Sequence, residues 1–490
     1  MVGSGPNGLT AAVVLARAGI QVTVYEAEHT IGGAARSSDT LGAGTVVDLG
    51  SAVHPLGVAS PVLRSLELER HGLRWRHAPA PLAHPLQDRP AALLHGDLSR
   101  TAVEQGLDAS AWRRLHEPFV RRWDDLVASV MSPLLRRPAH PLLMAGFGAA
   151  GAAPASVLAR ALFRGEPARA LFAGSATHAV LPLGAPLTAA FGVLFGTAGM
   201  TTGWPVPEGG AQAVSDALLG ELTAHGGRVE TGHLIQDLAD VGDVDLVMPD
   251  LTPRQVLLLG GTGLAPRYRM ALQRWRYGPG AFKVDYLLDG PVPWHDPRVG
   301  QASTVHLGGT LTEVAAAEAE VHRGRHPERP FVLLAQQDVA DPGRAPAGRR
   351  IVWAYTHVPN GSGRDVSEHI TDQVERFAPG FRDRVLARQV SSPARLEAMD
   401  ANLVGGDVKR RLLHRTAAAR STRPVREPLP DPVPGLFLCS ASTPPGGGVH
   451  GMCGHHAATA ALGRLATATG TTQEPQLHGP VPRPDHPRGP

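Results

Sequence analysis

Gly3-Ser4-Gly5-Pro6-Asn7-Gly8 fits the pattern G-x-G-x-x-G, and the rest of the chain is interpreted outward from it. In such a turn Gly3 allows the tight bend, Gly5 lets a pyrophosphate approach the backbone, and Gly8 lets helix and strand pack closely. The stretch therefore predicts a cradle for an adenine dinucleotide, whose pyrophosphate lies on the unpaired N–H groups at a helix N-terminus.

The residues that follow complete this nucleotide-binding unit. Residues 9–18 have a helix-forming composition, and residues 21–25 are a β-rich run that ends at Glu26. Glu26 comes eighteen residues after Gly8, where an acidic side chain accepts hydrogen bonds from ribose hydroxyls. The same carboxylate would repel a 2′-phosphate, which disfavours NADP.

The composition is that of a soluble globular protein with more than one domain. The chain has 490 residues, of which 43% are hydrophobic and 19% charged. Its net charge of +3 is small, and no basic run indicates nucleic-acid binding. Cys439 and Cys453 are the only cysteines, so there is neither a disulfide framework nor a C-x-x-C redox pair. We assign no metal site and expect a cytoplasmic location.

The glycine turn begins only two residues into the chain. A Rossmann-type turn follows a buried strand of about five residues, and a signal peptide has no room ahead of it. We therefore expect that the start codon is misplaced or that the chain is truncated.

A helical and increasingly apolar region follows. Residues 61–66 resemble a short helix, and residues 108–130 predict one amphipathic helix with a core-facing apolar stripe. Residues 142–204 are the most apolar, and no formally charged residue lies between Arg169 and Glu208. Prolines and glycines interrupt this stretch, which disfavours a membrane span and favours buried helices around an apolar substrate cavity. Docking on a membrane surface is the remaining alternative.

Strand-like runs and turns fill the middle of the chain. Residues 203–210 form a turn, and a helix at 211–225 and a strand at 228–231 return to the nucleotide unit. The other expected elements are a hairpin at 81–98, strands at 245–248, 281–288, 330–336 and 350–358, a helix or strand at 256–259, a helix at 365–377, and a loop at 393–407. No long helix separates the last two strands, so they predict an antiparallel sheet in a second domain.

A second glycine-rich loop lies near the C-terminus. Residues 435–440 are a short apolar run, residues 441–454 are rich in glycine, and an alanine-rich helix is expected at 455–466. Strand, glycine loop and helix again present backbone N–H groups to an anionic or electron-rich edge. Residues 472–490 are rich in proline and polar residues, which predicts a disordered tail.

With these motifs, the chain resembles the phytoene-desaturase-type FAD oxidoreductases, especially the branch related to pyridine nucleotide-disulfide oxidoreductase domain-containing protein 2. The resemblance extends to about residue 467. It is carried by Gly3–Gly8, Glu26 with Gly32-Gly33, Gly203-Trp204-Pro205 with Gly209-Gly210, Phe282-Lys283, and Thr443–Val449. Ser440 stands where the family has glycine, and residues 407–426 are shorter than the corresponding segment.

The resemblance implies an α/β fold and FAD as the cofactor. The FAD-binding residues it implies are Gly3, Gly5, Pro6, Asn7, Gly8, Glu26, Gly32, Gly33, Arg36, Val229, Ser442, Gly447, Gly448, Val449 and Gly451. Gly32, Gly33 and Arg36 would lie against the phosphates and ribityl chain, a backbone contact near Val229 would reach adenine, and the C-terminal loop would close over the isoalloxazine.

The domains are expected to interleave. A Rossmann-like FAD-binding domain, of the glutathione-reductase and amine-oxidase type, would comprise residues 1–58, 203–260 and 432–468. An α+β substrate domain would comprise a mainly helical part, 59–202, and an antiparallel sheet with helices, 261–431. Residues 469–490 would form the disordered tail.

Such a fold implies flavin chemistry, in which a substrate hydride passes to N5 of the flavin. The sequence offers no second unit of strand, glycine turn and helix for NAD(P)H, which favours oxygen or a quinone as the electron acceptor. Lys283 is the candidate catalytic group, because Lys283 and Lys409 are the only lysines and lysine, unlike arginine, is a compact charge whose pKa responds to burial. The alternative is an ordinary edge-strand lysine. His54, His357 and His450 are weaker acid–base candidates that we interpret as structural.

Three functions remain open at this stage. The uncharged region favours a desaturase or dehydrogenase acting on an apolar substrate. A flavin amine oxidase is the second, although it requires an aromatic cage and residues 440–454 contain no Phe, Tyr or Trp. The third is a flavoprotein that regulates partners without catalysis. The oligomeric state is not determined by the sequence.

Overall fold

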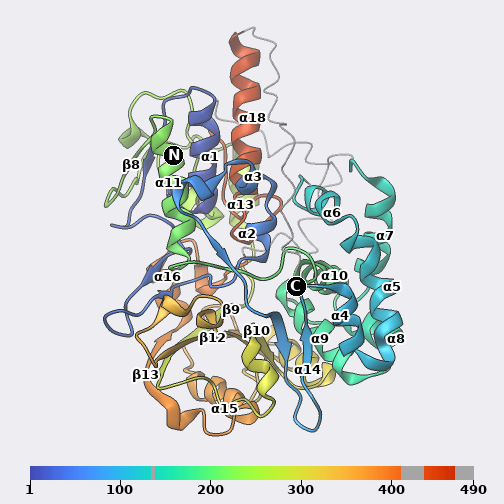
Figure 1. Cartoon of the computed structure of the whole chain (residues 1–490). Coiled ribbons are helices and arrows are strands. Elements are labelled where there is room, and N and C mark those ends of the chain that lie inside the picture. Colours follow the sequence, from blue (N-terminus) through green and yellow to red (C-terminus); the bar gives the residue numbers. More distant parts are fainter. Residues whose placement is uncertain (134–137, 410–434, 470–490) are drawn as a thin grey trace.

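The computed structural model describes residues 1–133, 138–409 and 435–469 (Figure 1). A small parallel sheet is assembled from three distant parts of the chain. Strand β1 (Thr23–Tyr25) pairs with β8 (Arg228–Glu230) on one side. On its other side Val2 bridges both Tyr25 and Pro249, and Val247 in turn bridges Leu436. The segments therefore run in the order 228–230, 23–25, 1–3, 247–249 and 436.

Helices from both ends of the chain pack together beside this sheet. Helix α1 (Pro6–Arg17) contacts α18 (Met452–Thr469) and α11 (Gln212–Ala224), and Figure 1 shows α1 and α18 side by side. The contact depends on Gly454, because a Cβ there would lie 1.9 Å from the carbonyl oxygen of Asn7. The expectation that the N- and C-terminal glycine loops come together is confirmed.

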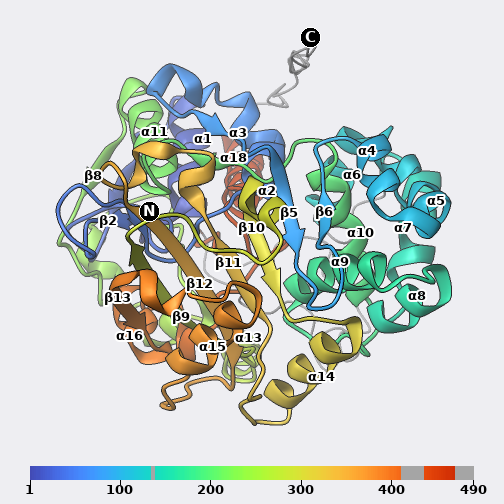
Figure 2. The ribbon, with the colours of Figure 1, turned by 60° about the horizontal axis from the view of Figure 1, so that its bottom comes forward.

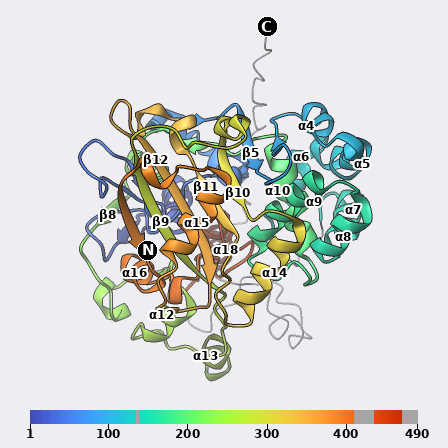
Figure 3. The same ribbon diagram turned by 90° about the horizontal axis from the view of Figure 1, so that it is seen from below.

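The second sheet has seven strands in the order β13-β9-β12-β11-β10-β5-β6 (Figure 3). All neighbouring pairs are antiparallel except β10 with β5, so the predicted antiparallel sheet and the hairpin are confirmed. Helix α15 (Ser367–Phe377) covers one face with Ile370, Val374 and Phe377. The strands are β5 (Ala80–His84), β6 (Ala92–Leu94), β9 (Gly280–Leu288), β10 (Ala302–Leu307), β11 (Val332–Ala335), β12 (Arg350–Val358) and β13 (Val385–Ser391).

Helices α4 to α10 form a separate layer beside this sheet (Figure 2). They are α4 (Leu98–Glu104), α5 (Ala109–Val120), α6 (Trp123–Val130), α7 (Pro141–Gly151), α8 (Ala155–Leu162), α9 (Glu166–Ala176) and α10 (Thr188–Gly199). In the described part of the chain, no individual helix has both the length and the apolarity to cross a bilayer. Only α7 and α8 taken together pass that test, and they are bent by 92° at their junction.

Four predicted elements differ from the structure, among them the strand expected at 245–248, which is only a bridge at Val247. The single helix expected at 108–130 is two helices, because Arg122 leaves helical geometry with φ −129° and ψ 38° and begins α6. The loop expected at 393–407 contains helix α16 (Pro393–Met399), which starts at a capping serine, Ser392, followed by a proline. The strand expected at 435–440 is reduced to one bridge at Leu436.

The remaining elements agree with expectation or lie outside the description. The run at 61–66 is helix α3 (Pro61–Ser65), and residues 256–259 belong mostly to helix α12 (Pro253–Leu258). Residues 410–426 of the shortened segment, and the predicted tail at 472–490, lie outside the described residues.

A buried cation joins the two halves of the fold. The Arg344 guanidinium is fully buried and pairs with Asp48 Oδ2 at 2.8 Å and with Asp341 Oδ2 at 2.7 Å. It also donates to the carbonyl oxygen of Pro207 at 2.7 Å. These contacts fix strand β3 (Val47–Asp48), which follows the nucleotide motif, against the loop that leads into β12.

Candidate active site

One cavity of about 660 Å³ runs from the glycine turn to the inner face of the seven-stranded sheet. That volume lies within the range of small-molecule and cofactor sites. Its nucleotide end is lined by Gly3–Asn7, Glu26, Glu28, Gly33–Arg36, His233–Gln236 and Asp250. Its other end, which we call the inner chamber, is lined by His178, Phe195, Trp204, Lys283, Thr304, Leu333, Trp353, Tyr355 and Lys409.

The nucleotide end is built on the N-terminus of α1. Gly5 is the N-cap residue, and no side chain of its own caps the helix. The Gly8 amide instead donates to Asp250 Oδ2 at 2.9 Å. A Cβ on Gly5 would lie 2.5 Å from that oxygen, and a Cβ on Gly8 would lie 2.3 Å from the Gly3 carbonyl oxygen. The backbone contact at Gly8 therefore excludes any other residue, and a side chain at Gly5 would have to displace the Asp250 carboxylate.

Glu26 is held in place by the same turn. Its carboxylate accepts hydrogen bonds from the Ser4 amide at 2.8 Å, the Ser4 hydroxyl at 2.5 Å and the Glu28 amide at 3.0 Å. The residue is buried yet lines the cavity. These bonds fix the carboxylate at the edge where a ribose would lie.

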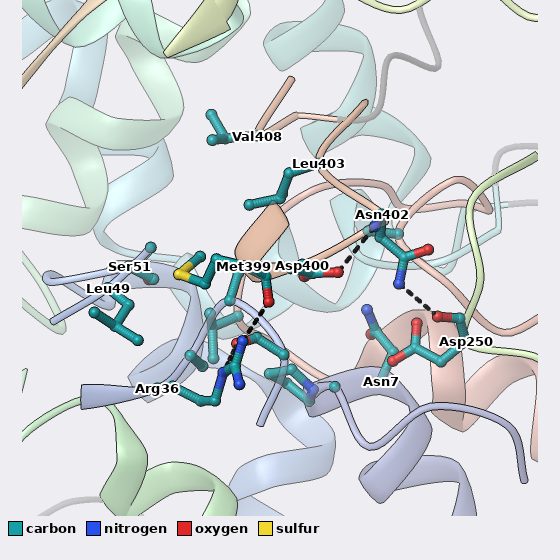
Figure 4. Close-up of a pocket in the computed structure, with 18 of the residues that line it drawn as sticks. Asn7, Arg36, Leu49, Ser51, Asp250, Met399, Asp400, Asn402, Leu403 and Val408 are labelled. Carbon is teal, nitrogen blue, oxygen red and sulfur yellow. Dashed lines mark hydrogen bonds between the residues drawn. The ribbon is translucent and has the colours of Figure 1, made fainter. Parts of the chain in front are cut away.

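A segment that includes α16 forms one wall over the nucleotide end (Figure 4). The Arg36 guanidinium donates to the carbonyl oxygen of Gly33 at 2.8 Å and to that of Met399 at 2.5 Å. Asn402 donates to the Asp250 carbonyl oxygen at 3.0 Å, and its Oδ1 accepts from the Thr252 amide at 2.7 Å. Figure 4 shows the bond from Arg36 to the Met399 carbonyl and the bond from Asn402 to Asp250. The wall is therefore tied to both sides of the cradle.

The register of the large sheet determines the inner chamber. Lys283 of β9 pairs with Tyr355 of β12, which pairs with Leu333 of β11. Asp285 pairs with Trp353 in the next row on the same face, because alternate residues of a strand point to the same side. One sheet face thus presents a lysine, an acid and two aromatic side chains, while the opposite face packs on α15.

Lys283 does not lie on an edge strand, because β9 is flanked by β13 and β12. The edge-strand alternative is therefore wrong. Its Nζ forms a buried ion pair with Asp285 and lies 5.8 Å from the centre of the Trp353 ring. Burial raises the pKa of Asp285 to about 6, although the Lys283 charge opposes that rise. The ion pair with Asp285 balances the lysine's charge within the sheet face.

Aromatic rings and imidazoles form the opposite wall. The His178 ring stacks on Phe195 with centroids 4.6 Å apart and meets Trp204 edge-on at 5.1 Å. Behind it, His306 Nε2 lies 3.2 Å from His178 Nε2. Burial lowers the pKa of both imidazoles well below the ordinary value, so both are neutral at neutral pH.

The predicted site residues divide into two groups. The structure brings Gly3, Gly5, Pro6, Asn7, Glu26, Gly33, Arg36, Lys283, Gly448 and Val449 together on the cavity wall. The residues that do not line it are Gly8, Gly32, Val229, Ser442, Gly447 and Gly451. Several of these hold the cradle together instead: Gly451 lies against Thr10, and Gly447 lies against the backbone of Lys409. Val229 pairs with Val24, and residues 233–236 reach the cavity in its place.

The histidines singled out from the sequence occupy different positions. His357 Nδ1 pairs with Glu318 at 3.0 Å, and His450 Nε2 donates to the Gly446 carbonyl oxygen at 3.0 Å, so both have structural partners. His54 lines the cavity, and burial lowers its pKa to about 4. The sequence interpretation missed Asp250, His178, Lys409, Trp353 and Tyr355. For Trp353 and Tyr355 the sequence did contain a signal. They are two residues apart in a predicted strand, which places both side chains on the same face of the sheet.

The residues present fit an adenine dinucleotide. Glycine is required at the helix N-terminus, an oriented carboxylate stands at the ribose position, and the buried Asn7 Oδ1 lines the cavity with no hydrogen-bond partner among the described residues. The same part of the chain contains no group of three or more His, Cys, Asp or Glu side chains arranged to hold a metal ion.

Comparison with known sequences agrees with this geometry. Residues 1–66 match the family model of the NAD(P)-binding Rossmann-like domain. Pyridine nucleotide-disulfide oxidoreductase domain-containing protein 2 of Rattus norvegicus is 27% identical over 547 aligned positions, covering 94% of this chain and 92% of the relative. A lycopene-forming phytoene desaturase of Pseudescherichia vulneris is 25% identical, covering 52% of this chain and 55% of the relative.

Solved structures share the fold at low sequence identity. An oxidoreductase from Methanosarcina mazei has a TM-score of 0.61 and 16% identity, covering 94% of this chain and 99% of that chain. Putrescine oxidase bound to putrescine has a TM-score of 0.58 and 18% identity, covering 95% and 98%. The chain therefore has a Rossmann-like N-terminal domain within an amine-oxidase-like α/β fold, and over most of its length it is similar in sequence to pyridine nucleotide-disulfide oxidoreductase domain-containing protein 2.

Proposed function

We propose that the protein is an FAD-dependent oxidoreductase that removes a hydride from an apolar substrate and is reoxidised by oxygen or a quinone. The observation that carries this proposal is that one continuous cavity joins a dinucleotide cradle to an apolar and aromatic chamber. Oxidation by a flavin requires this continuity, because the reacting carbon must reach the cofactor without crossing water.

The chain's own residues would bind and orient the reactants. The α1 N-terminus would hold the pyrophosphate, Glu26 the ribose hydroxyls, and the loop at Gly448 and Val449 the far end of the cofactor. When bound, FAD supplies the hydride acceptor. Phe195, Trp204 and Leu333 would hold the substrate and exclude water from the chamber.

Lys283 is the residue we propose for proton handling. Its ammonium reaches the chamber wall, and its buried partner Asp285 keeps the charge balanced. An ammonium in this position can orient a water molecule or the substrate oxygen and can return a proton to the acceptor during reoxidation. The nearby Trp353 ring limits its movement.

A flavin amine oxidase is the second candidate. Trp353 and Tyr355 meet edge-on at 5.1 Å and supply aromatic rings from β12, a source that the composition of residues 440–454 did not reveal. The charge of the chamber disfavours amines, however, because the ionisable side chains that line it among the described residues are two lysines, a histidine and a tyrosine, with no carboxylate. A screen of amines for hydrogen peroxide release distinguishes the two candidates.

The cofactor test uses the purified full-length protein. We expect it to carry FAD that is released on denaturation, and we expect Gly5→Ala to lose it, because the new Cβ collides with the Asp250 carboxylate. Gly148→Ala is the matched control, since a Cβ there has no neighbour within 4 Å. A folded protein that is colourless and does not bind added FAD would disprove the proposal.

The catalytic test uses lipids that copurify with the protein. A substrate should bleach the flavin without oxygen, and oxygen or a quinone should restore its colour. Lys283→Met alone leaves Asp285 buried without a partner, so the informative variant is Lys283→Met with Asp285→Leu. Normal flavin content with unchanged turnover in this double variant would remove Lys283 from the mechanism.

A further inference from the structure

The two lysines of this chain lie at the same end of the cavity but differ in how their charge is balanced. Lys283 is paired with Asp285. Lys409 Nζ lies over the Phe195 ring, 5.8 Å from its centre, and no described carboxylate pairs with it within ion-pair distance. The neighbouring acid, Asp407, uses its Oδ1 to accept from the Lys409 backbone amide at 2.8 Å and its Oδ2 to accept from the Gly278 amide at 2.8 Å.

Negative charge is concentrated at the other end of the cavity. The carboxylates that line it among the described residues are Glu26, Glu28, Asp250 and Asp400. Glu26 and Glu28 follow β1, Asp250 lies at the N-terminus of α1, and Asp400 Oδ2 faces Gly33. Among the residues that the structure describes, the inner chamber is therefore left with one cation, Lys409, that no contacting carboxylate neutralises.

The apolar surroundings of Lys409 make its unbalanced positive charge more costly. Aromatic and aliphatic side chains form most of the chamber wall, and a cation in such a setting is less stable than in water. Burial lowers the pKa of Lys409 to about 8, although Asp407 acts in the opposite direction. A ligand that brings a negative charge next to this ammonium would relieve the imbalance, and the low polarity of the chamber would strengthen the pairing.

We infer that the substrate is an apolar molecule that carries a carboxylate, which Lys409 binds at the inner end of the cavity. This inference rests on the proposed function and specifies its substrate class. The carboxylate would accept charge-assisted hydrogen bonds from the Lys409 ammonium. The apolar part of the molecule would pack on Phe195, Trp204 and Leu333, which line the same chamber.

The pH dependence of binding follows from the groups around Lys409. These are Asp407 from its own segment, His178 from the wall beside α10, and His450 from the C-terminal glycine loop. Burial lowers the pKa of both histidines, that of His450 to about 4, so both stay neutral above neutral pH. Carboxylate affinity is therefore expected to fall as the pH rises through 8, where free Lys409 loses its proton.

The experiment uses the flavin-containing full-length protein and three probes of one shape: 3-phenylpropionate, 3-phenylpropan-1-ol and 3-phenylpropylamine. Binding is measured from the change in flavin absorbance and from quenching of the chamber tryptophans. At about pH 7 we expect the carboxylate to bind about tenfold more tightly than the alcohol and the amine to bind most weakly. At about pH 9.5 the preference for the carboxylate should shrink severalfold.

Lys409→Met should retain the flavin and bring the carboxylate and the alcohol to similar affinity. Arg349→Met is the control, because it removes one exposed positive charge outside the cavity and should leave the preference unchanged. Equal affinities in the unmodified protein, or a preference that survives Lys409→Met, would overturn the inference while leaving the proposed function intact. A protein that holds no flavin would instead contradict the proposed function itself.

Discussion

The carboxylate of Asp250 accepts a hydrogen bond from the backbone amide of Gly8 at 2.9 Å, across 242 residues of sequence. The N-cap residue of α1 is Gly5, which has no side chain to cap the helix. The Asp250 carboxylate takes over that capping role. The residue that caps this helix therefore follows Pro249, whose bridge to Val2 adds a distant segment to the same parallel sheet.

Removal of this cap should destabilise the protein. We expect Asp250→Ala to lower the free energy of unfolding by about 1–2 kcal/mol, because the Gly8 amide loses its acceptor in a buried position. Asp250→Asn keeps an oxygen acceptor and should cost less. Urea unfolding of the flavin-free proteins measures both changes, and equal stability of the alanine variant and the unmodified protein would contradict the capping role.

The contact between α1 and α18 should tolerate no added methyl group. A Cβ at Gly454 would lie 1.9 Å from the Asn7 carbonyl oxygen, so Gly454→Ala has to separate the two helices. We expect a loss of about 1–3 kcal/mol together with weaker flavin retention. Gly463→Ala on the same helix has open space around it and should be neutral or stabilising by up to about 1 kcal/mol. Similar effects of the two substitutions would refute this account.

Arg344 should contribute more to stability than exposed arginines do. Arg344→Met leaves Asp48 and Asp341 without their buried cation, which we expect to cost about 3–5 kcal/mol. Arg349→Met, at an exposed position, should change stability by no more than about 0.5 kcal/mol. Thermal and urea unfolding of the two variants provide the comparison. A mild effect at Arg344 would show that the two halves of the fold are held by other contacts.

Acid should destabilise the fold in part through His116. The His116 imidazole is fully buried, and its one hydrogen-bond partner among the described residues is Thr197, whose Oγ1 lies 3.1 Å from His116 Nδ1. Burial lowers the pKa of His116 to about 3. Because the folded-state pKa lies below the unfolded value of about 6.5, the unfolded chain takes up the proton first. The contribution of neutral His116 is thus present above about pH 6.5 and is lost as the pH falls toward 3.

His116→Asn keeps a polar atom near the position of Nδ1 and removes the titration. It should be less stable than the unmodified protein at about pH 7, and the difference should narrow by up to about 1.4 kcal/mol per pH unit below about 6.5. Urea unfolding at several pH values tests this. Parallel stability curves for the two proteins would exclude His116 as a source of acid sensitivity.

The nucleotide half of the site could be predicted because its signals are local. The spacing of Gly3, Gly5 and Gly8 and the acid at Glu26 each act on neighbouring backbone, and the structure places all but Gly8 on the cavity wall. Strands β9 and β12 were also evident from their β-rich composition. Helix α16 was missed, although Ser392 followed by Pro393 is a helix-start signal, because the segment is short and rich in turn-forming residues.

The substrate half could not be predicted in the same way because its geometry is set by pairing between distant strands. Lys283 and Tyr355 are neighbours only because β9 pairs with β12 in one particular register. No signal in the sequence around either residue predicts that register. Lys409 reaches Phe195 only through the path of the chain after α16. The histidine pair, His178 with His306, likewise joins residues 128 positions apart.

The parallel sheet closes only when segments that lie far apart in the sequence meet. Leu436 bridges Val247, and α18 packs on α1. Contacts of such long sequence separation form slowly. We therefore expect the proposed FAD to bind only after these contacts have formed.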